Sequence, residues 1–107
     1  LNAVDGTHAG AVAVSLMSIN DDGQRKTLFT AESDAHGRFS HDFDAVNGQS
    51  YEMVIASGAY FKTANLPRSG AQILDEIVVR FTTPDPDSRY HIPVIMAPNS
   101  YSCWWSA

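Results

Sequence analysis

Two neighbouring runs near the end of the chain decide the fold: Tyr-His-Ile-Pro-Val-Ile-Met at residues 90–96 and Tyr-Ser-Cys-Trp-Trp at residues 101–105. In the first run apolar and other side chains alternate, which is typical of a strand with one buried face. His91, Pro93 and Ile95 would share the face opposite to Tyr90, because side chains alternate across a strand. The Pro98-Asn99 turn between the runs predicts that the second run returns as a final short strand.

Alternation at period two recurs upstream, and helical periodicity hardly appears. The Ile73–Thr82 run is apolar on both faces, which predicts a central strand. One or two helical turns are expected within Ala59–Asn65. Further strands are expected from Val12, over Thr27–Glu32, from Arg38, and over Tyr51–Ala56. Seven to eight short strands with turns between them predict an all-β sandwich with one short helix, a single domain over residues 1–107.

The hairpin before residue 38 gives that strand its orientation. Asp34-Ala35-His36-Gly37 is a turn sequence, and Gly37 suits the positive φ that closes a short hairpin. In the strand that follows, Phe39, His41 and Phe43 would face one way. Arg38 would then point away from this aromatic, core-seeking face.

The composition excludes several classes of function. With 44% hydrophobic and 18% charged residues, the 107-residue chain resembles ordinary globular domains. The net charge of −5 and the scattered basic residues argue against a nucleic-acid partner. No apolar run approaches the roughly 18 residues that span a bilayer, and no charged-then-apolar leader opens the sequence. We therefore expect no nucleic-acid and no membrane partner.

The cysteine and the histidines indicate neither a disulfide nor a metal site. Cys103 is the single cysteine, which excludes an internal disulfide and suits a reducing compartment. We expect a cytoplasmic protein, with the peroxisome as the alternative. His8, His36 and His41 show no ligand spacing with each other or with Cys103, so neither a metal nor another cofactor is expected.

These segments together resemble the 5-hydroxyisourate hydrolase and transthyretin family. That family has a Tyr-His-Ile/Val-Pro strand and a Ser-Tyr-Ser-Thr-Tyr-Arg-Gly-Ser terminus. The resemblance continues over Val4-Asp5, Asp34–Arg38, Gly58–Phe61 and Glu76–Thr82, so it covers nearly the whole chain. It implies a transthyretin-like β-sandwich assembled as a dimer of dimers, and we therefore expect a homo-oligomer. Two adjacent tryptophans near the terminus also predict an exposed apolar patch in a monomer.

The resemblance to the catalytic set is incomplete. The hydrolases place an N-terminal histidine, an arginine after the hairpin glycine, the histidine of the Tyr-His-Ile-Pro strand and the terminal Tyr-Arg-Gly-Ser around a channel between subunits. Arg38 and His91 match the arginine and the second histidine. Asn2 stands where the first histidine is expected, although about three residues are missing near Gly10. The terminal tetrapeptide reads Trp104-Trp105-Ser106-Ala107.

The candidate catalytic residues are His91 and Arg38. An imidazole with an ordinary pKa of about 6.5 can take and return a proton. The Arg38 guanidinium can hold an anionic oxygen as it develops. The alternatives are a hydrogen bond at an interface for His91 and a solvated arginine beside Asp42 for Arg38.

The candidate substrate-binding residues are Asn2, Cys103, Trp104, Trp105 and Ser106. Asn2 cannot be a general base, yet its amide can orient a ligand; the alternative is capping of a strand edge. If the strand continues, the two tryptophan rings point to opposite faces, so one can pack in the sandwich while the other stacks on a planar ligand. Cys103 has no group nearby that would activate its thiol, and an inert buried thiol is the alternative.

Three functions follow from this pattern. The first is a diverged hydroxyisourate hydrolase-like enzyme that acts on a small aromatic or polycyclic molecule by acid/base chemistry: elimination, isomerisation, addition or cyclisation. Loss of one histidine and of the terminal arginine, and the more apolar tryptophan wall, favour it. The second is a transthyretin-like binder without chemistry, against which the presence of Arg38 and His91 argues. The third is an authentic 5-hydroxyisourate hydrolase.

Overall fold

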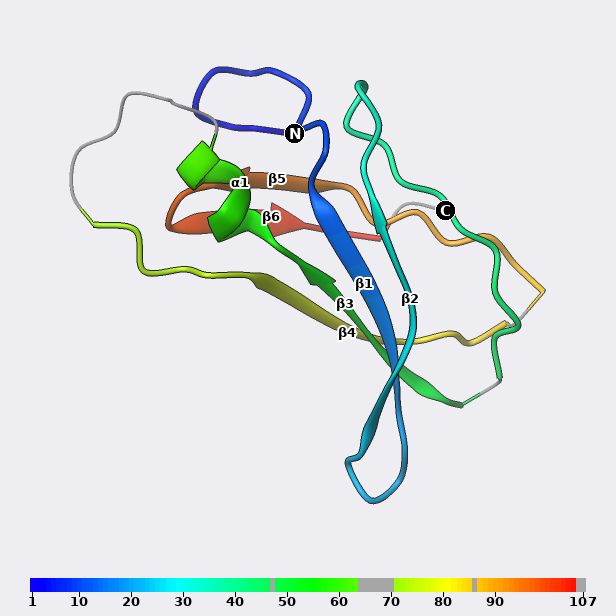
Figure 1. Cartoon of the computed structure of the whole chain (residues 1–107). Helices are drawn as coiled ribbons and strands as arrows, with labels where there is room; N and C mark the ends of the chain where they lie inside the picture. The colour runs from blue at the N-terminus through cyan, green and yellow to red at the C-terminus, as the bar shows by residue number, and fades with distance from the viewer. Residues whose placement is uncertain (47, 64–70, 86, 106–107) are drawn as a thin grey trace.

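The computed structural model of the chain describes residues 1–46, 48–63, 71–85 and 87–105. Within these residues it has six strands in two sheets and one short helix, α1, at Ser57–Thr63 (Figure 1). The larger sheet has the order β2-β1-β3-β4, and β5 pairs with β6 in the smaller one. The bounds of the strands are β1 Ala13–Ile19, β2 Arg25–Glu32, β3 Ser50–Ile55, β4 Ile77–Thr82, β5 Val94–Ala97 and β6 Ser100–Cys103. The predicted all-β fold with one short helix is confirmed.

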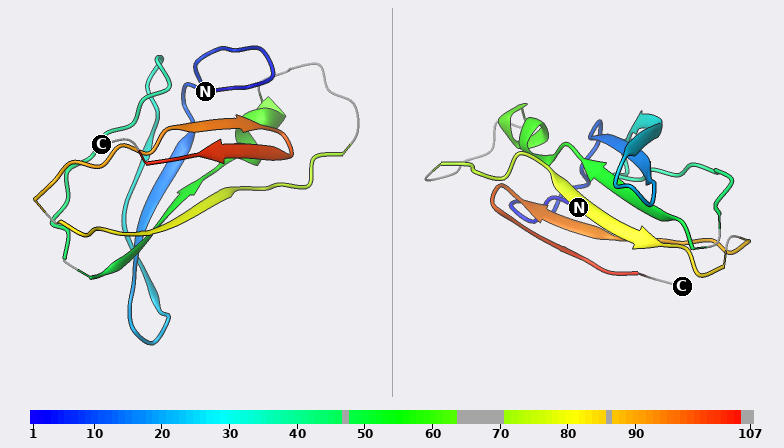
Figure 2. Two further views of the ribbon diagram at one scale, coloured as in Figure 1. Left: turned by 180° about the vertical axis from the view of Figure 1, so that it is seen from behind. Right: turned by 90° about the horizontal axis from the view of Figure 1, so that it is seen from below.

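The two sheets lie face to face as layers, which the view from below shows best (Figure 2). All the strand pairs within the two sheets are antiparallel. The N-terminal segment adds to the free side of β5, because Asn2 forms a parallel bridge with Met96. Three hydrogen bonds hold this segment. The Leu1 amino group donates to the Val94 carbonyl, the Met96 N–H donates to the Leu1 carbonyl, and the Ala3 N–H donates to the Met96 carbonyl.

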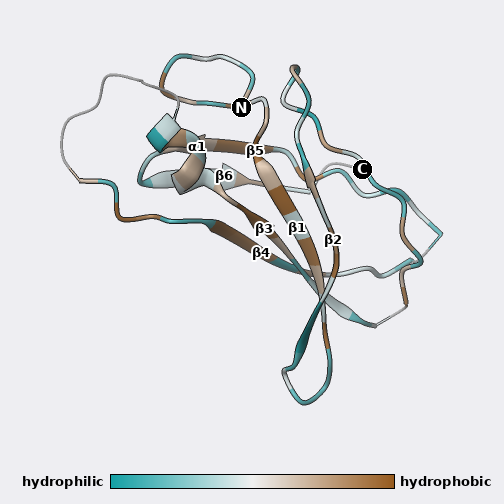
Figure 3. Cartoon of the chain, viewed as in Figure 1, coloured by the Kyte–Doolittle hydropathy of each residue, from teal (hydrophilic) through white to brown (hydrophobic). Residues whose placement is uncertain are grey.

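The core lies between the two sheets. One face of the large sheet carries Val14 of β1, Ile55 of β3 and Ile77 of β4, which are opposed residues in the ladders. They pack with Met96 of β5 and Phe61 of α1 in a single buried cluster. The hydropathy colouring agrees: β1, β3, β4 and β5 carry brown runs, while the β1–β2 turn is hydrophilic (Figure 3). The helix thus closes one end of the sandwich.

The predicted strand from Arg38 differs from the structure. Residues 38–46 run extended but belong to no described ladder. The predicted alternation nevertheless holds, since the rings of Phe39, His41 and Phe43 all contact the ring of Phe29 on β2. Side-chain packing therefore holds this segment on the sandwich without backbone pairing. Because this segment is not a strand, the described residues contain six strands instead of the predicted seven to eight.

Two further strands differ from their predictions. β4 covers only the second half of the predicted Ile73–Thr82 strand, and it lies at an edge of the sheet, not in its centre. Its outer face, which carries Val78, Arg80 and Thr82, is correspondingly open, and Val78 is 43% exposed. β5 begins at Val94 instead of Tyr90 because Pro93 has no N–H to give to the ladder. The helix begins two residues earlier than predicted and spans Ser57–Thr63, while Asn65 lies outside the described residues.

The predicted turn before residue 38 is confirmed, although the segment after it joins no described ladder. Gly37 has a φ of 70°, and its N–H donates to the Asp34 carbonyl at 2.9 Å. A side chain at residue 37 would also meet the backbone nitrogen of Ala9 at 3.0 Å. Glycine is required there both by the backbone angle and by the close approach of the N-terminal segment.

Candidate functional site

The β5–β6 hairpin separates the candidate residues onto two faces. Val94 opposes Cys103 and Met96 opposes Tyr101, and both apolar members of these pairs pack against the core. Ile95 and its partner Ser102 therefore face outward, because neighbouring residues point to opposite faces. We call the side that carries Ile95 and Ser102 the outer face of the hairpin.

His91 and Trp104 belong to this outer face. The Trp104 N–H donates to the Pro93 carbonyl at 3.4 Å, which continues the ladder one pair beyond β5 and β6. Trp104 thus opposes Pro93, and His91 lies two residues further along the same side. Both His91 and Trp104 are exposed, and the imidazole has no hydrogen-bond partner among the described residues. Diagonal neighbours in such a ladder have Cα atoms about 7 to 8 Å apart, so one small planar molecule can reach both side chains.

Trp105 lies on the other side of the hairpin. Its ring contacts that of Tyr90, with centroids 5.9 Å apart and planes inclined by 41°. Tyr90 directly precedes His91, and Trp104 directly precedes Trp105. Tyr90 and Trp105 therefore lie on one side of the hairpin, and His91 and Trp104 lie on the other. Trp105 is nevertheless 62% exposed, because it sits at the end of the sheet rather than within the core.

Asn2 is buried and turned inward. It is 1% exposed, and as the bridge partner of Met96 it shares the inner face of the small sheet. Its side-chain Nδ2 donates to the Tyr60 hydroxyl at 3.2 Å, and its Oδ1 accepts from the Val4 N–H at 2.9 Å. Within one chain this amide therefore holds the N-terminal turn to the sandwich instead of pointing toward His91.

Cys103 also faces inward, since it opposes Val94, and its thiol is free and half-buried. Ser106 lies outside the described residues. Cys103 therefore lies on the side of the hairpin opposite to His91.

Arg38 is exposed, and its guanidinium has no hydrogen-bond or ion-pair partner among the described residues. Its backbone is fixed by Asp34: the Arg38 N–H donates to Asp34 Oδ1 at 2.9 Å, and the Asp34 N–H donates to the Arg38 carbonyl at 2.8 Å. The bonds from the N–H groups of Arg38 and then His36 hold the pKa of Asp34 below its ordinary value. Figures 1 and 2 place the segment after β2 at the same end of the molecule as the end of β6. The backbone of Arg38 is thus held by the turn, while its guanidinium has no partner among the described residues.

Sequence reasoning did not name the other residues of the outer face as site residues. Ile95 and Ser102 lie there by register, and Leu1 and Ala3 flank the inward Asn2 on the adjoining segment. The alternation around His91 did signal Ile95. Ser102 could be assigned only when the 94–103 pairing was known, because the sequence does not fix the register of a hairpin.

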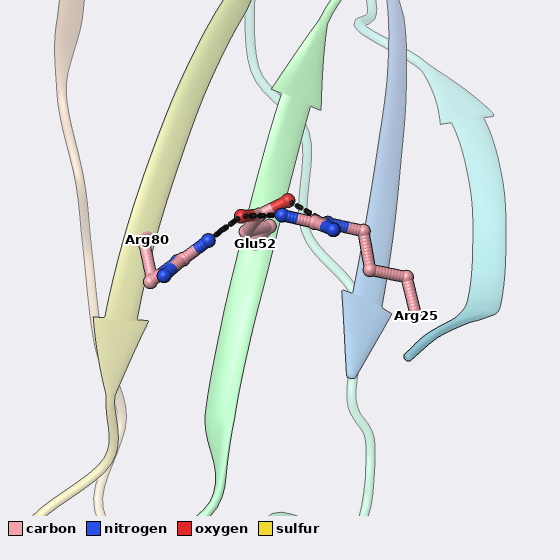
Figure 4. Close-up of polar contacts among 3 residues, drawn as sticks. All are labelled: Arg25, Glu52 and Arg80. Carbon is pink, nitrogen blue, oxygen red and sulfur yellow. Dashed lines mark hydrogen bonds and ion pairs between the residues drawn. The ribbon is translucent and has the colours of Figure 1, made fainter. Parts of the chain in front are cut away.

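A second charged group lies on the opposite side of the molecule. Glu52 of β3 accepts from Arg25 of β2 and from its direct ladder neighbour Arg80 of β4 (Figure 4). The shortest contacts are 2.8 Å from Arg25 Nε and 2.7 Å from Arg80 Nη2. Hydrogen bonds from Arg25 and then Arg80 lower the pKa of Glu52 from 4.5 to about 2. Glu52 alternates with the core residues Tyr51 and Met53, so this group faces away from β5 and His91.

The remaining features of the described residues do not add to the candidate site. A shallow polar hollow beside the β1–β2 turn is lined by Asn20, Gln49 and Arg80, among others, and contains none of the predicted site residues. No three His, Cys, Asp or Glu side chains in the described ranges are placed to share a metal ion. No helix in this part of the chain is long and apolar enough to cross a bilayer.

Comparison with known proteins defines the class. The sandwich superimposes on transthyretin from Sparus aurata with a TM-score of 0.84, at 23% identity, over 99% of this chain and 90% of that one. It superimposes on (S)-allantoin synthase with a TM-score of 0.82, at 24% identity, over all of this chain and 41% of the synthase. The fold is therefore a transthyretin-like β-sandwich.

Sequence similarity then gives the family. The HIUase/Transthyretin family matches residues 1–105. The chain is 32% identical to 5-hydroxyisourate hydrolase of Caulobacter vibrioides over 97% of this chain and 90% of that enzyme. It is 27% identical to the enzyme of the same name from Ralstonia nicotianae, over 97% and 91%. The chain belongs to the HIUase/transthyretin family, as the sequence motifs predicted.

Proposed function

We propose that the protein is a diverged hydroxyisourate hydrolase-like enzyme that acts on a small aromatic or polycyclic molecule by acid/base chemistry. The observation that carries the proposal is the exposed placement of His91 and Trp104 on one face of the β5–β6 hairpin. An indole face stacks on planar rings, and a neighbouring imidazole can move a proton at neutral pH. The family relatives named 5-hydroxyisourate hydrolase support an enzyme.

The chemistry assigns a role to each exposed side chain. His91 takes a proton from the bound molecule, or from a water that attacks it, and returns the proton to the atom that leaves. Arg38 holds the oxygen that becomes negative in between, because a free guanidinium offers two parallel donors. Trp104 stacks on the planar part of the substrate. The same proton transfer serves an elimination, isomerisation, addition or cyclisation.

A second copy of the chain completes the site in this proposal. The outer face is an open surface in one chain, and a water-excluding site needs a second wall. The exposed Trp104 side chain on this face is apolar surface that such a copy would cover. A homo-oligomer, a dimer of dimers by the family resemblance, would bring several copies of His91 to one channel.

The test begins with freshly generated 5-hydroxyisourate and continues with larger aromatic lactams and lactones. Absorbance decay is measured with the wild type, His91→Ala, Arg38→Ala and a family hydrolase as reference. The proposal expects turnover of a larger aromatic substrate that falls at least a hundredfold in His91→Ala. Decay of 5-hydroxyisourate near the reference rate would instead identify an authentic hydrolase.

A transthyretin-like binder is the second candidate. A solved relative in fold is sea bream transthyretin in complex with thyroxine, and the exposed indole of Trp104 suits an aromatic ligand equally well. Quenching of tryptophan fluorescence by aromatic ligands, lost in Trp104→Leu, without turnover of any of them and without an effect of His91→Ala, would favour binding alone.

A further inference from the structure

The turn that leads into His91 is closed by a tyrosine. The Tyr90 hydroxyl accepts from the Asp85 N–H at 2.8 Å and donates to the Asp85 carbonyl at 2.6 Å. A single side-chain oxygen thus binds both backbone groups of one residue five positions earlier. This fixes the Tyr90 ring and the backbone on both sides of the turn.

The Asp85 carboxylate closes the same turn from inside. Its Oδ1 accepts from the Asp87 N–H at 3.0 Å, and its Oδ2 accepts from the Ser88 hydroxyl at 2.7 Å. The hydrogen bond from Ser88, and after it the one from the Asp87 N–H, keep the pKa of Asp85 below its ordinary value, so the carboxylate stays charged. We call Asp85, Ser88 and Tyr90 the Tyr90 lock.

Trp105 covers the lock from the other strand. Its ring lies on Tyr90, while the preceding residue, Trp104, donates to the Pro93 carbonyl. Neighbouring side chains in extended chain point to opposite faces. A contact between Tyr90 and Trp105 on one face therefore directs His91 and Trp104 to the other face together.

We infer that the Tyr90 lock and Trp105 position the imidazole of His91 beside Trp104, so that Trp105 is a positioning residue and Trp104 is the ligand-contacting one. The inference rests on the proposed function of His91. The sequence left open which of the two tryptophans packs against the protein and which contacts a ligand, and the inference assigns one role to each. Trp105 stands where the resembling hydrolases carry an arginine. In this chain its contact is structural: a ring on a ring, turned away from the outer face.

Two measurements test the positioning role, and the first needs no substrate. Proton–carbon NMR spectra of the imidazole Cε1–H groups are recorded for wild type, Tyr90→Phe, Trp105→Leu and Trp105→Phe, with His91→Ala to assign the signal. We expect the His91 signal to shift and broaden in Tyr90→Phe and Trp105→Leu, to recover in Trp105→Phe, and the His8 and His36 signals to stay unchanged. Tyr101→Phe is the matched control, since Tyr101 is exposed and its hydroxyl has no partner among the described residues.

The second measurement separates the two tryptophans kinetically on whichever substrate the wild type turns over. A misplaced catalytic group costs about 10²-fold per ångström, so Tyr90→Phe and Trp105→Leu should lower kcat at least tenfold with KM changed less than twofold. Trp104→Leu should instead raise KM at least tenfold. Ser88→Ala opens the lock more gently and replaces Tyr90→Phe if that variant does not fold.

Each outcome has one meaning. An unmoved His91 signal in folded Tyr90→Phe, Ser88→Ala and Trp105→Leu overturns the positioning role. A raised KM or weaker ligand binding in Trp105→Leu with an unmoved His91 signal makes Trp105 a ligand contact and overturns the division. Absence of wild-type turnover on every substrate overturns the proposed function instead, while the NMR result still decides whether the lock orients His91.

Discussion

At the scale of single residues, Glu52 carries the clearest electrostatic prediction. Its side chain is 7% exposed and is held by two arginines. We expect Glu52→Gln to lower the free energy of unfolding by about 1 to 3 kcal/mol, because strong hydrogen bonds to a buried charge are lost. Thermal unfolding at one protein concentration measures the change. Glu32→Gln, at an exposed end of β2, is the matched control and should stay within about 0.5 kcal/mol.

The pH dependence of the same residue has a definite sign. The pKa of Glu52 lies at about 2 in the folded protein, below its ordinary 4.5. Its contribution to stability is therefore complete above pH 4.5 and is lost as the pH falls from 4.5 through 2. Acid unfolding followed by circular dichroism should show the wild type losing its advantage over Glu52→Gln across that range. A difference between the two proteins that stays constant from pH 7 to 2 would contradict this assignment.

Asn2 gives a second prediction at this scale. The family resemblance suggests Asn2→His as the change that restores hydrolase chemistry, yet the Asn2 side chain is buried and bonded to Tyr60 and Val4. We expect Asn2→His to destabilise the protein by about 1 to 3 kcal/mol and to leave the decay of 5-hydroxyisourate unchanged. Ala3→His, on the exposed neighbour, is the control that adds an imidazole to the outer face at little cost in stability. An Asn2→His variant that is fully stable and faster would show that Asn2 reaches the site.

At the scale of elements, the start of α1 allows a prediction about Gly58→Ala. The sign of the change in stability decides whether helix propensity or a steric clash dominates. Helix propensity alone would make Gly58→Ala stabilising by up to about 1 kcal/mol. However, a Cβ at residue 58 would lie 2.6 Å from the Asp75 carbonyl oxygen, to which the Gly58 N–H also donates. We expect the clash to dominate and to destabilise by about 1 to 3 kcal/mol, measured by denaturant unfolding. Ala59→Gly, on the exposed side of the same helix, should cost about 1 kcal/mol from propensity alone; a stabilised Gly58→Ala would refute the close approach.

The same elements show what sequence pattern can and cannot supply. Alternation correctly placed Phe39, His41 and Phe43 on one face, toward Phe29, but it reports which way side chains point and not whether a backbone partner exists. The apolar run at β4 predicted burial on both faces, while its place at the sheet edge depends on distant pairing. For the candidate site, alternation and motif predicted His91, Arg38 and Trp104, and their roles stay predictions. Alternation and motif could not show that Asn2 and Cys103 face inward, because facing depends on register.

At the scale of the whole molecule, the free edge of β6 is the feature that bears on assembly. Among the described residues β6 pairs only with β5, and its sequence Ser-Tyr-Ser-Cys has neither lysine nor proline to protect the edge. The Trp104 bond to the Pro93 carbonyl marks a hydrogen-bonded pair, so by alternation Ser102 and Ser100 also bond toward β5. The N–H groups of Tyr101 and Cys103 therefore point to the open edge, where a second copy can pair.

This geometry makes assembly testable with one substitution. We expect the wild type to run as an oligomer in size-exclusion chromatography with light scattering, and Tyr101→Pro to reduce the assembly at least to half its mass, because proline removes an edge donor. The β5–β6 ladder should survive, since residue 101 donates nothing to β5. Tyr101→Val, which removes the same ring but keeps the N–H, is the control and should retain the wild-type mass. Tyr101→Pro retaining full mass with unchanged folding would exclude pairing through β6. Wild type eluting as a monomer would exclude that pairing too and would remove the second wall that the proposed site requires.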